Sequence, residues 1–197
     1  MIRKDITFDN FMTLDADSRK ELLKDREFMK QLVKKNMKKS RYLHSLSVAD
    51  TCEMLAECHG VDPDKAYMAG LLHDVCKFPD EKTSGVLEEY LKKYDPEKLN
   101  SIQGGYHGWV AKYYLIEKCD YKDEEILNAI YNHTICNSDD KLSLILYIAD
   151  KREPLRKIDD DILEIAKYDL YRAYEMLKDD VEQYVRGKNE GFVKNSV

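Results

Sequence analysis

Apolar residues recur at helical spacing in almost every segment of this chain, and no other feature constrains its fold as strongly. Residues three or four positions apart lie on one face of an α-helix, so this pattern gives each helix a side that can be buried. A β-rich fold needs turn residues about every 8–12 positions, whereas the chain has only 8 Gly and 4 Pro among its 197 residues. We therefore expect an all-α fold, and the length suits a single domain.

Several of the expected helices have recognisable ends. Helical periodicity covers residues 18–38, 40–58, 63–76, 83–94, 106–119, 124–134, 140–152 and a long last segment from 159. Ser40 is expected to cap the second of these helices, and Gly60 fits its end. Asp62 followed by Pro63 supplies an N-cap and a proline at the first position of the third helix, which Pro79 is expected to end.

The composition argues against several classes of protein. The 14 Tyr, 5 Phe and 1 Trp are too many aromatic residues for a disordered chain. No stretch approaches the roughly 20 apolar residues of a membrane helix, and the first residues lack the apolar core of a signal peptide. The net charge of −6 disfavours nucleic acid and anionic membranes as partners. The 5 cysteines form no C-x-x-C motif, so a cytoplasmic chain with reduced thiols is expected.

One cluster of basic residues stands out against this acidic balance. Within eight positions the chain carries Lys34, Lys35, Lys38, Lys39 and Arg41. The simpler interpretation is a solvated helix end, where cations complement the helix dipole. A rim that attracts phosphate, or a nucleic-acid patch, is the alternative interpretation.

Ionisable residues also occupy positions where the helical pattern predicts a buried face. The residues concerned are His44, His73, Asp74, His133 and Asp150. A packed structural role is the simpler interpretation for any one histidine, but burying this many polar groups costs several kcal/mol, roughly, unless something satisfies them. A shared divalent metal centre would satisfy them together, and imidazole with carboxylate suits Zn, Fe, Mn or Co.

The order of these residues resembles a known pattern. His44, the adjacent His73-Asp74 pair and Asp150 are arranged as in the HD-domain metal-dependent phosphohydrolases, and His107 and His133 between them resemble the two-metal branch of that superfamily. The local motifs are similar to those of the YqeK family: Arg41-Tyr42-Leu43-His44, Ala69-Gly70-Leu71-Leu72-His73-Asp74 with Lys77, Tyr106-His107-Gly108, Ile130-Tyr131-Asn132-His133-Thr134, and Tyr147-Ile148-Ala149-Asp150 with Glu153-Pro154 and Arg156. Members of that family are bacterial symmetrical diadenosine tetraphosphatases.

The resemblance covers most of the chain, from about residue 40 to residue 180, and implies an HD-type helical bundle. It divides the chain into a helical lead-in (1–39), the HD phosphohydrolase domain (40–185) and a C-terminal tail (186–197). Between Asp150 and Glu153 this chain has Lys151-Arg152, where an aromatic and an aliphatic residue are common in the family. This departure touches none of the expected metal ligands.

The resemblance also implies the roles of individual residues. One divalent metal would be held by His44, His73, Asp74 and Asp150, and a second by Asp74, His107 and His133, so that Asp74 bridges the two. A hydroxide shared by the metals would attack an inner phosphorus of diadenosine tetraphosphate and release two ADP. Iron is the expected metal, with manganese or cobalt as alternatives.

Three further residues are expected to contact the nucleotide. Lys77 would act with Asp74 in catalysis and bind a phosphate oxygen or the leaving group. Arg156 suits bidentate binding of a phosphate, and Thr134 offers a hydroxyl group. A solvated lysine and an ordinary surface arginine are the simpler interpretations of the two cations. A homodimer is left open.

Three other functions use a similar ligand set. A di-iron HD oxygenase would oxidise a small polar substrate and would stop working without O2. A non-catalytic sensor would bind a nucleotide or metal and release no product. An HD hydrolase of (p)ppGpp or mononucleotides usually holds one metal, which the additional His107 and His133 disfavour.

Overall fold

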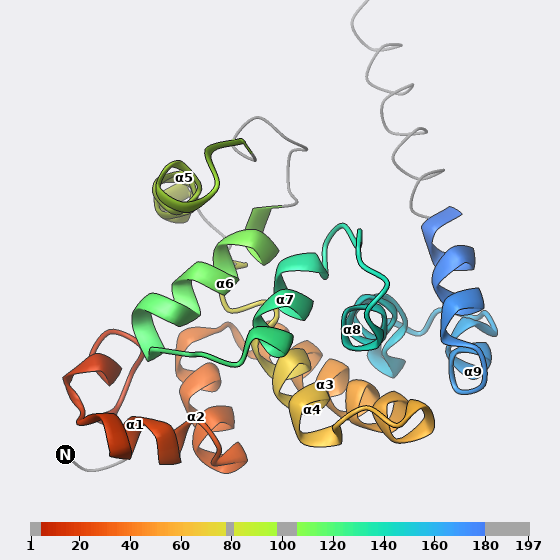
Figure 1. Ribbon diagram of the computed structural model, residues 1–197, viewed down its shortest axis with the longest axis horizontal. Coiled ribbons are helices and arrows are strands. Elements are labelled where there is room, and N and C mark those ends of the chain that lie inside the picture. The colour runs from red at the N-terminus through yellow and green to blue at the C-terminus, as the bar shows by residue number, and fades with distance from the viewer. Residues whose placement is uncertain (1–4, 78–80, 98–105, 180–197) are drawn as a thin grey trace, which may run out of the picture.

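The computed structural model describes residues 5–77, 81–97 and 106–179. Across these ranges the regular secondary structure is helical and contains no strand, which confirms the predicted all-α fold (Figure 1). The helices are α1 (Ala16–Leu22), α2 (Arg26–Asn36), α3 (Lys39–His59), α4 (Pro63–Leu72), α5 (Glu81–Tyr94), α6 (Tyr106–Cys119), α7 (Glu124–Asn132), α8 (Lys141–Arg152) and α9 (Ile162–Ala166). Two short 3₁₀ helices are η2 (Phe11–Thr13) and η4 (Pro154–Arg156), and residues 170–179 are also helical.

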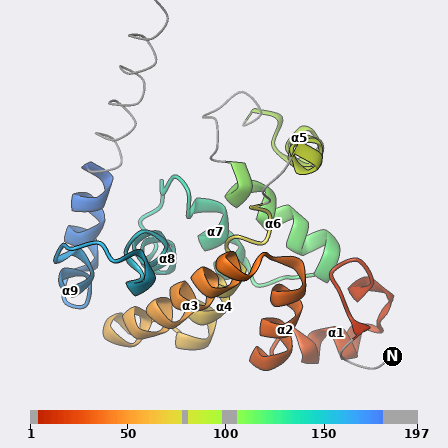
Figure 2. The same cartoon turned by 180° about the vertical axis from the view of Figure 1, so that it is seen from behind.

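Helices α3 and α4 form the centre of the molecule. Both pack against α8, α7 packs against α4 and α8, and α6 covers α7. Helices α1 and α2 lie at one end of the molecule, and α9 lies at the other (Figures 1 and 2). The ends of α4, α7 and α8 thereby meet the first half of α3, and this is where the ionisable residues gather.

The N-terminal lead-in shares the core of the rest of the chain. Ile6, Phe8, Phe11 and Phe28 are buried in one cluster with the apolar residues of α3, α4, α6, α7 and α8. The apolar side chains before residue 40 therefore cover the core of their own chain. The division of the chain at residues 39 and 185 stays a prediction.

The sequence pattern joined two pairs of helices that the structure separates. Instead of one helix over 18–38, α1 ends at Leu22 and α2 begins at Arg26, because the side chain of Asp25 accepts a hydrogen bond from the Phe28 N–H (3.0 Å). The predicted long last helix is likewise broken after Ala166, and Asp169 caps the next helical segment. At both sites an aspartate caps a new helix, and a local hydrogen bond overrides the apolar periodicity.

Some of the other predicted helix ends agree with the structure and some do not. Gly60 ends α3 with a left-handed φ of 66°, and Asp62 and Pro63 begin α4 as predicted. Ser40 was wrong as a cap, since α3 begins at Lys39 with no side-chain hydrogen bond at its N-cap. The third helix ends at Leu72 and not near residue 76, and Pro79 lies outside the described residues.

Two expectations from composition can be compared with the structure. In the described ranges, none of the helices combines the length and the apolar character that crossing a bilayer requires. All five cysteines are free thiols, of which Cys58 is exposed and the other four are buried.

Candidate metal centre

The structure brings the six predicted ligands together from widely separated parts of the chain. His44 lies on α3, Asp150 lies in the last turn of α8, and His107 lies in the first turn of α6. His73 and His133 are the C-cap residues of α4 and α7, and Asp74 follows His73. All six side chains are buried or nearly so.

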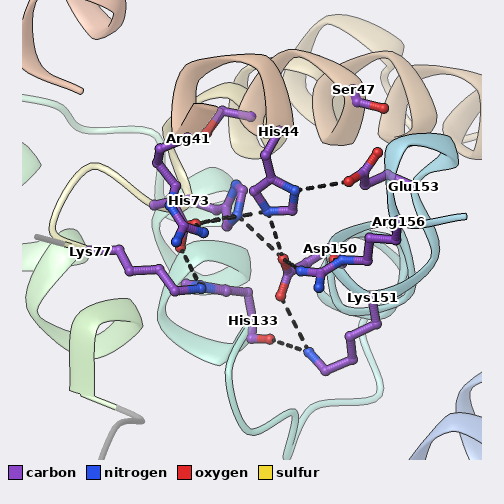
Figure 3. A network of polar contacts seen from close by, with 12 residues as sticks. Arg41, His44, Ser47, His73, Lys77, His133, Asp150, Lys151, Glu153 and Arg156 are labelled. Carbon is purple, nitrogen blue, oxygen red and sulfur yellow. Dashed lines mark hydrogen bonds and ion pairs between the residues drawn. The ribbon is translucent and has the colours of Figure 1, made fainter. Parts of the chain in front are cut away.

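One group of ligands surrounds a single oxygen of Asp150. Its Oδ1 atom lies 3.1 Å from His44 Nε2 and 3.6 Å from His73 Nε2. The donor atoms of these three residues lie within 4.8 Å of one another, as a shared cation would require. Figure 3 shows both imidazoles directed toward this carboxylate.

Asp74 lies between this group and a second one, and its two oxygens face different histidines. Its Oδ2 atom lies 3.4 Å from His73 Nε2 and 3.8 Å from His44 Nε2. Its Oδ1 atom lies 3.3 Å from His107 Nε2 and 3.7 Å from His133 Nε2. A carboxylate in this position can serve two cations at once.

The rings of His73 and His133 are each fixed by a local hydrogen bond of the same kind. Each Nδ1 donates a 2.7 Å hydrogen bond to the main-chain carbonyl three residues earlier, Gly70 for His73 and Ile130 for His133. With the proton on Nδ1, the Nε2 atom of a neutral imidazole carries a lone pair. In its neutral form each ring therefore directs this lone pair into the carboxylate cluster, as in metal-bound histidines.

Two glycines allow the elements to approach closely enough. A Cβ atom on Gly70 would lie 2.6 Å from the Cα atom of Ala49, so α3 and α4 could not pack as they do. A Cβ atom on Gly108 would lie 2.9 Å from His133 Nδ1 and 3.0 Å from the Ile130 carbonyl oxygen. Gly108 thus leaves the space that the His133 ring occupies beside α6.

Two buried polar atoms of the cluster have no hydrogen bond, although charged or ionisable groups lie 3.3–3.6 Å from them. His73 Nε2 and Asp74 Oδ1 are inaccessible to solvent and form no hydrogen bond. Leaving such atoms unsatisfied costs about 1–3 kcal/mol each. A divalent cation would satisfy both, and a donor set of imidazole nitrogens and carboxylate oxygens suits Zn, Fe, Mn or Co. The residues present therefore fit a metal centre.

Both central carboxylates stay ionised despite their burial. Burial disfavours the charged form of Asp74, but His73 and then His107 beside it hold its pKa well below the usual range. Burial likewise opposes ionisation of Asp150, and the neighbouring Lys151 ammonium lowers its pKa. The cluster therefore presents two negative charges to a bound cation.

The histidines differ in their protonation. Burial disfavours protonation of His73, yet Asp74 and Asp150 outweigh it and raise its pKa to about 9. Burial dominates at His133, whose pKa falls to about 4, and it also lowers the pKa of His107. The second histidine pair is therefore neutral at pH 7 and available as ligands.

Cations line the more accessible side of the cluster. Lys77 Nζ lies 3.4 Å from Asp74 Oδ1, and Arg156 Nη2 donates to Asp150 Oδ1 at 3.0 Å. Both predicted cations thus reach the cluster, with about a third of each side chain exposed. Thr134 is half-buried in the bend that follows His133.

Sequence reasoning gave three residues at this site no role among the predicted site residues. The simpler interpretation placed Arg41 at a solvated helix end, with a phosphate-attracting rim or a nucleic-acid patch as the alternative, and its Nη1 atom donates to Asp74 Oδ2 at 2.8 Å. Lys151 is half-buried, and its Nζ atom lies 3.0 Å from the His133 carbonyl oxygen. Glu153 accepts from His44 Nδ1 at 3.1 Å (Figure 3). Spacing offered a signal for two of these residues. Arg41 lies three positions before His44, and Glu153 lies three positions after Asp150.

A separate cavity of about 690 Å³ lies away from this cluster. It is bounded by α1, the start of α2, the start of α4 and the loop before α7, and its apolar lining includes Leu23, Met68, Tyr121 and Ile126. None of the six expected ligands lines it. The cavity therefore takes no part in the chemistry of the metal centre.

Comparison with known proteins places the chain in a family. The family model described as "HD domain" matches residues 41–155, which is more than half of the chain. This chain therefore belongs to the HD-domain family, and the resemblance found from its motifs is confirmed.

Its relatives narrow the class further. It is 35% identical to a symmetrical bis(5'-nucleosyl)-tetraphosphatase of Staphylococcus aureus, over 71% of this chain and 73% of the relative. It is 31% identical to the protein of that name from Bacillus subtilis, over 76% of this chain and 81% of the relative. A solved structure, described as a predicted HD superfamily hydrolase involved in NAD metabolism from Clostridium acetobutylicum, matches with a TM-score of 0.68 and 28% identity over 89% of each chain.

Proposed function

We propose that this protein is a metal-dependent phosphohydrolase that cleaves diadenosine tetraphosphate symmetrically into two ADP. The relatives with this named activity cover most of the chain. The supporting observation in the structure is the position of Asp74, each of whose two oxygens faces a different pair of histidines. That arrangement suits one carboxylate shared by two divalent ions.

The ligands divide between the two ions as the family resemblance implies. His44, His73, Asp74 and Asp150 would hold one ion, and Asp74, His107 and His133 would hold the other. Divalent ions bound there supply Lewis-acid stabilisation of phosphoryl oxygens and lower the pKa of a coordinated water to about 7. The protein holds the imidazoles in the required tautomer through the carbonyls of Gly70 and Ile130.

The three accessible cations would bind the polyphosphate chain. Arg41 and Lys77 contact Asp74, and Arg156 contacts Asp150. When these carboxylates ligate metal, the same ammonium and guanidinium groups can turn toward phosphate oxygens. Arginine suits this role because its donors match two oxygens of one phosphate. Thr134 would add a hydroxyl donor beside His133.

The direct test uses purified protein with diadenosine tetraphosphate and Fe²⁺, Mn²⁺ or Co²⁺, followed by separation of the products. The proposal expects ADP as the sole nucleotide product, and excess chelator should abolish its formation. AMP together with ATP would place the cleavage at a different phosphorus and refute the symmetrical reaction. Binding without any product would favour the sensor.

The oxygenase and the (p)ppGpp hydrolase are not favoured by the relatives' names. Retention of full activity under strict anaerobiosis separates hydrolysis from oxygenation.

Iron is the metal that we propose for both positions, with manganese or cobalt as alternatives. The mixed nitrogen and oxygen donor set supports any of these ions. Elemental analysis of protein purified without oxygen would identify the resident metal. The cytoplasmic location and a homodimer stay predictions.

A further inference from the structure

Glu153 is a buried carboxylate whose two oxygens both have defined partners. Only 2% of the residue is exposed. Its Oε1 atom lies 3.1 Å from His44 Nδ1, and its Oε2 atom accepts a 2.6 Å hydrogen bond from the Leu155 N–H (Figure 3 shows the contact with His44). Burying a carboxylate is costly unless its partners are well placed.

The contact with His44 differs from those of the other fixed histidines. His73 and His133 donate from Nδ1 to the main-chain carbonyls of Gly70 and Ile130. A substitution at either position changes the side chain and leaves the carbonyl acceptor in place. The recorded partner of His44 Nδ1 is a side chain, Glu153. A carboxylate accepts only, so it places the proton of a neutral imidazole on Nδ1 and leaves the Nε2 lone pair facing Asp150.

The second oxygen of Glu153 acts on the other side of the site. Its bond to the Leu155 N–H caps the short helix η4. That turn brings Arg156 back to Asp150, where Nε donates to the main-chain carbonyl (2.5 Å) and Nη2 to Oδ1 (3.0 Å). One buried side chain thus holds both a proposed metal ligand and a proposed phosphate-binding cation.

We propose that Glu153 is a positioning residue that sets the tautomer of His44 and the place of Arg156. The proposal rests on the proposed function, since it assigns His44 to a metal. Glu153 touches neither metal nor substrate in this scheme and acts through the two residues that do. Its effect should appear first in the affinity for the ion that His44 holds.

The substitution Glu153→Gln separates the two contacts because glutamine offers one acceptor and one donor group. If its oxygen accepts from His44, its NH2 group faces the Leu155 N–H, and two donors then meet. If the amide is reversed, its NH2 group faces His44 Nδ1 and favours the tautomer with the proton on Nε2, which cannot bind a metal through Nε2. The reversed orientation satisfies both hydrogen bonds and is therefore favoured, so the substitution acts on the tautomer of His44 while side-chain volume is kept.

The experiment measures ion binding by competition with a coloured chelator, using Zn²⁺ as a diamagnetic probe. It compares wild type, Glu153→Gln and the control Glu164→Gln, whose side chain on α9 is 65% exposed. We expect Glu153→Gln to weaken one ion about 10–100-fold, the usual effect of removing such an outer partner. The other ion and the control should bind as in wild type.

A second measurement records the ring nitrogens of His44 by NMR in the zinc-loaded wild type. We expect a proton on Nδ1 and a metal-bound Nε2, a signature that a purely structural role would not require. The opposite assignment would overturn the proposal even if Glu153→Gln cannot be purified in a folded form. Equal affinity of Glu153→Gln and wild type for both ions would also overturn it.

The outcomes distinguish this proposal from the hydrolase proposal. Weaker binding of one ion by Glu153→Gln supports the positioning role even if the wild type cleaves no diadenosine tetraphosphate. Cleavage to two ADP by a variant with unchanged ion affinities would leave the hydrolase intact and remove the role of Glu153.

Discussion

Replacing Gly108 by alanine tests whether the exact position of the His133 ring controls the rate of the reaction. Gly108 lies in the first turns of α6, and its missing side chain leaves room for His133. The added Cβ would lie 2.9 Å from Nδ1 and 3.0 Å from Cε1 of that ring, and 3.0 Å from the Ile130 carbonyl oxygen. Ordinary contact begins at about 3.4 Å, so roughly 0.5 Å must open between α6 and the ring.

The size of the effect follows from this displacement. A misplacement of about 1 Å can cost about 100-fold in rate, so roughly half of it should lower kcat/KM about tenfold. Overpacking costs about 1–3 kcal/mol, and the better helix propensity of alanine returns up to about 1 kcal/mol. The net loss of about 0–3 kcal/mol is small against a typical unfolding free energy of about 5–15 kcal/mol. The enzyme should therefore stay folded while its activity falls.

The assay measures kcat/KM for diadenosine tetraphosphate, bound metal per chain and the thermal unfolding midpoint. Gly60→Ala is the matched control, because Gly60 has a φ of 66° and nothing within 4 Å of its would-be Cβ. That variant should lose about 1 kcal/mol of stability through backbone strain and keep its activity. Wild-type kcat/KM in Gly108→Ala would refute the reasoning, as would an equal loss of activity in Gly60→Ala.

Three further predictions concern the charged groups. Asp74→Ala should abolish loading at both metal positions, and elemental analysis that finds two ions per chain would disprove the bridging role. Lys77→Met should raise KM or lower kcat about tenfold or more, as expected for a lost charge-assisted contact worth about 1.5–3 kcal/mol, whereas Lys118→Met, on the outer end of α6, should behave as wild type. In chelator, thermal unfolding should depend on pH in both directions. The pKa of His133, about 4, lies below that of an unfolded histidine (roughly 6.5), so its contribution to stability is lost as the pH falls from about 6.5 to 4. The pKa of His73, about 9, lies above it, so its contribution is complete below about pH 6.5 and is lost as the pH rises to about 9. An unfolding midpoint that stays constant from pH 5 to pH 9 would contradict both assignments.

Helical periodicity was enough to predict the fold class but not every helix boundary. Apolar spacing identifies which residues face a core, and it continues unchanged across the breaks at Asp25 and Asp169. Each break depends on one side chain that bonds the main chain in preference to continuing the helix. Such a choice depends on the local geometry, which spacing alone does not record.

The candidate site was predictable in its centre and not in its surroundings. Five of the expected ligands stand out because ionisable groups at buried positions need a shared partner, and the family resemblance added His107. The structure brings all six together. Arg41, Lys151 and Glu153 look like ordinary surface charges in the sequence, because their spacing from His44 or Asp150 does not by itself show what they contact. Their roles depend on how α3 and α8 meet, which is a property of the tertiary structure.

The hydrogen bonds from His73 and His133 to carbonyls of their own helices have a consequence for metal exchange. Each of these hydrogen bonds joins residues that are only three positions apart in the sequence, so it forms when α4 or α7 forms, with or without an ion. The rings need no rearrangement of the backbone to release one cation and accept another. The metal found in the protein should consequently follow the supply of the cell, and a culture enriched in manganese should yield manganese-loaded protein with the same fold.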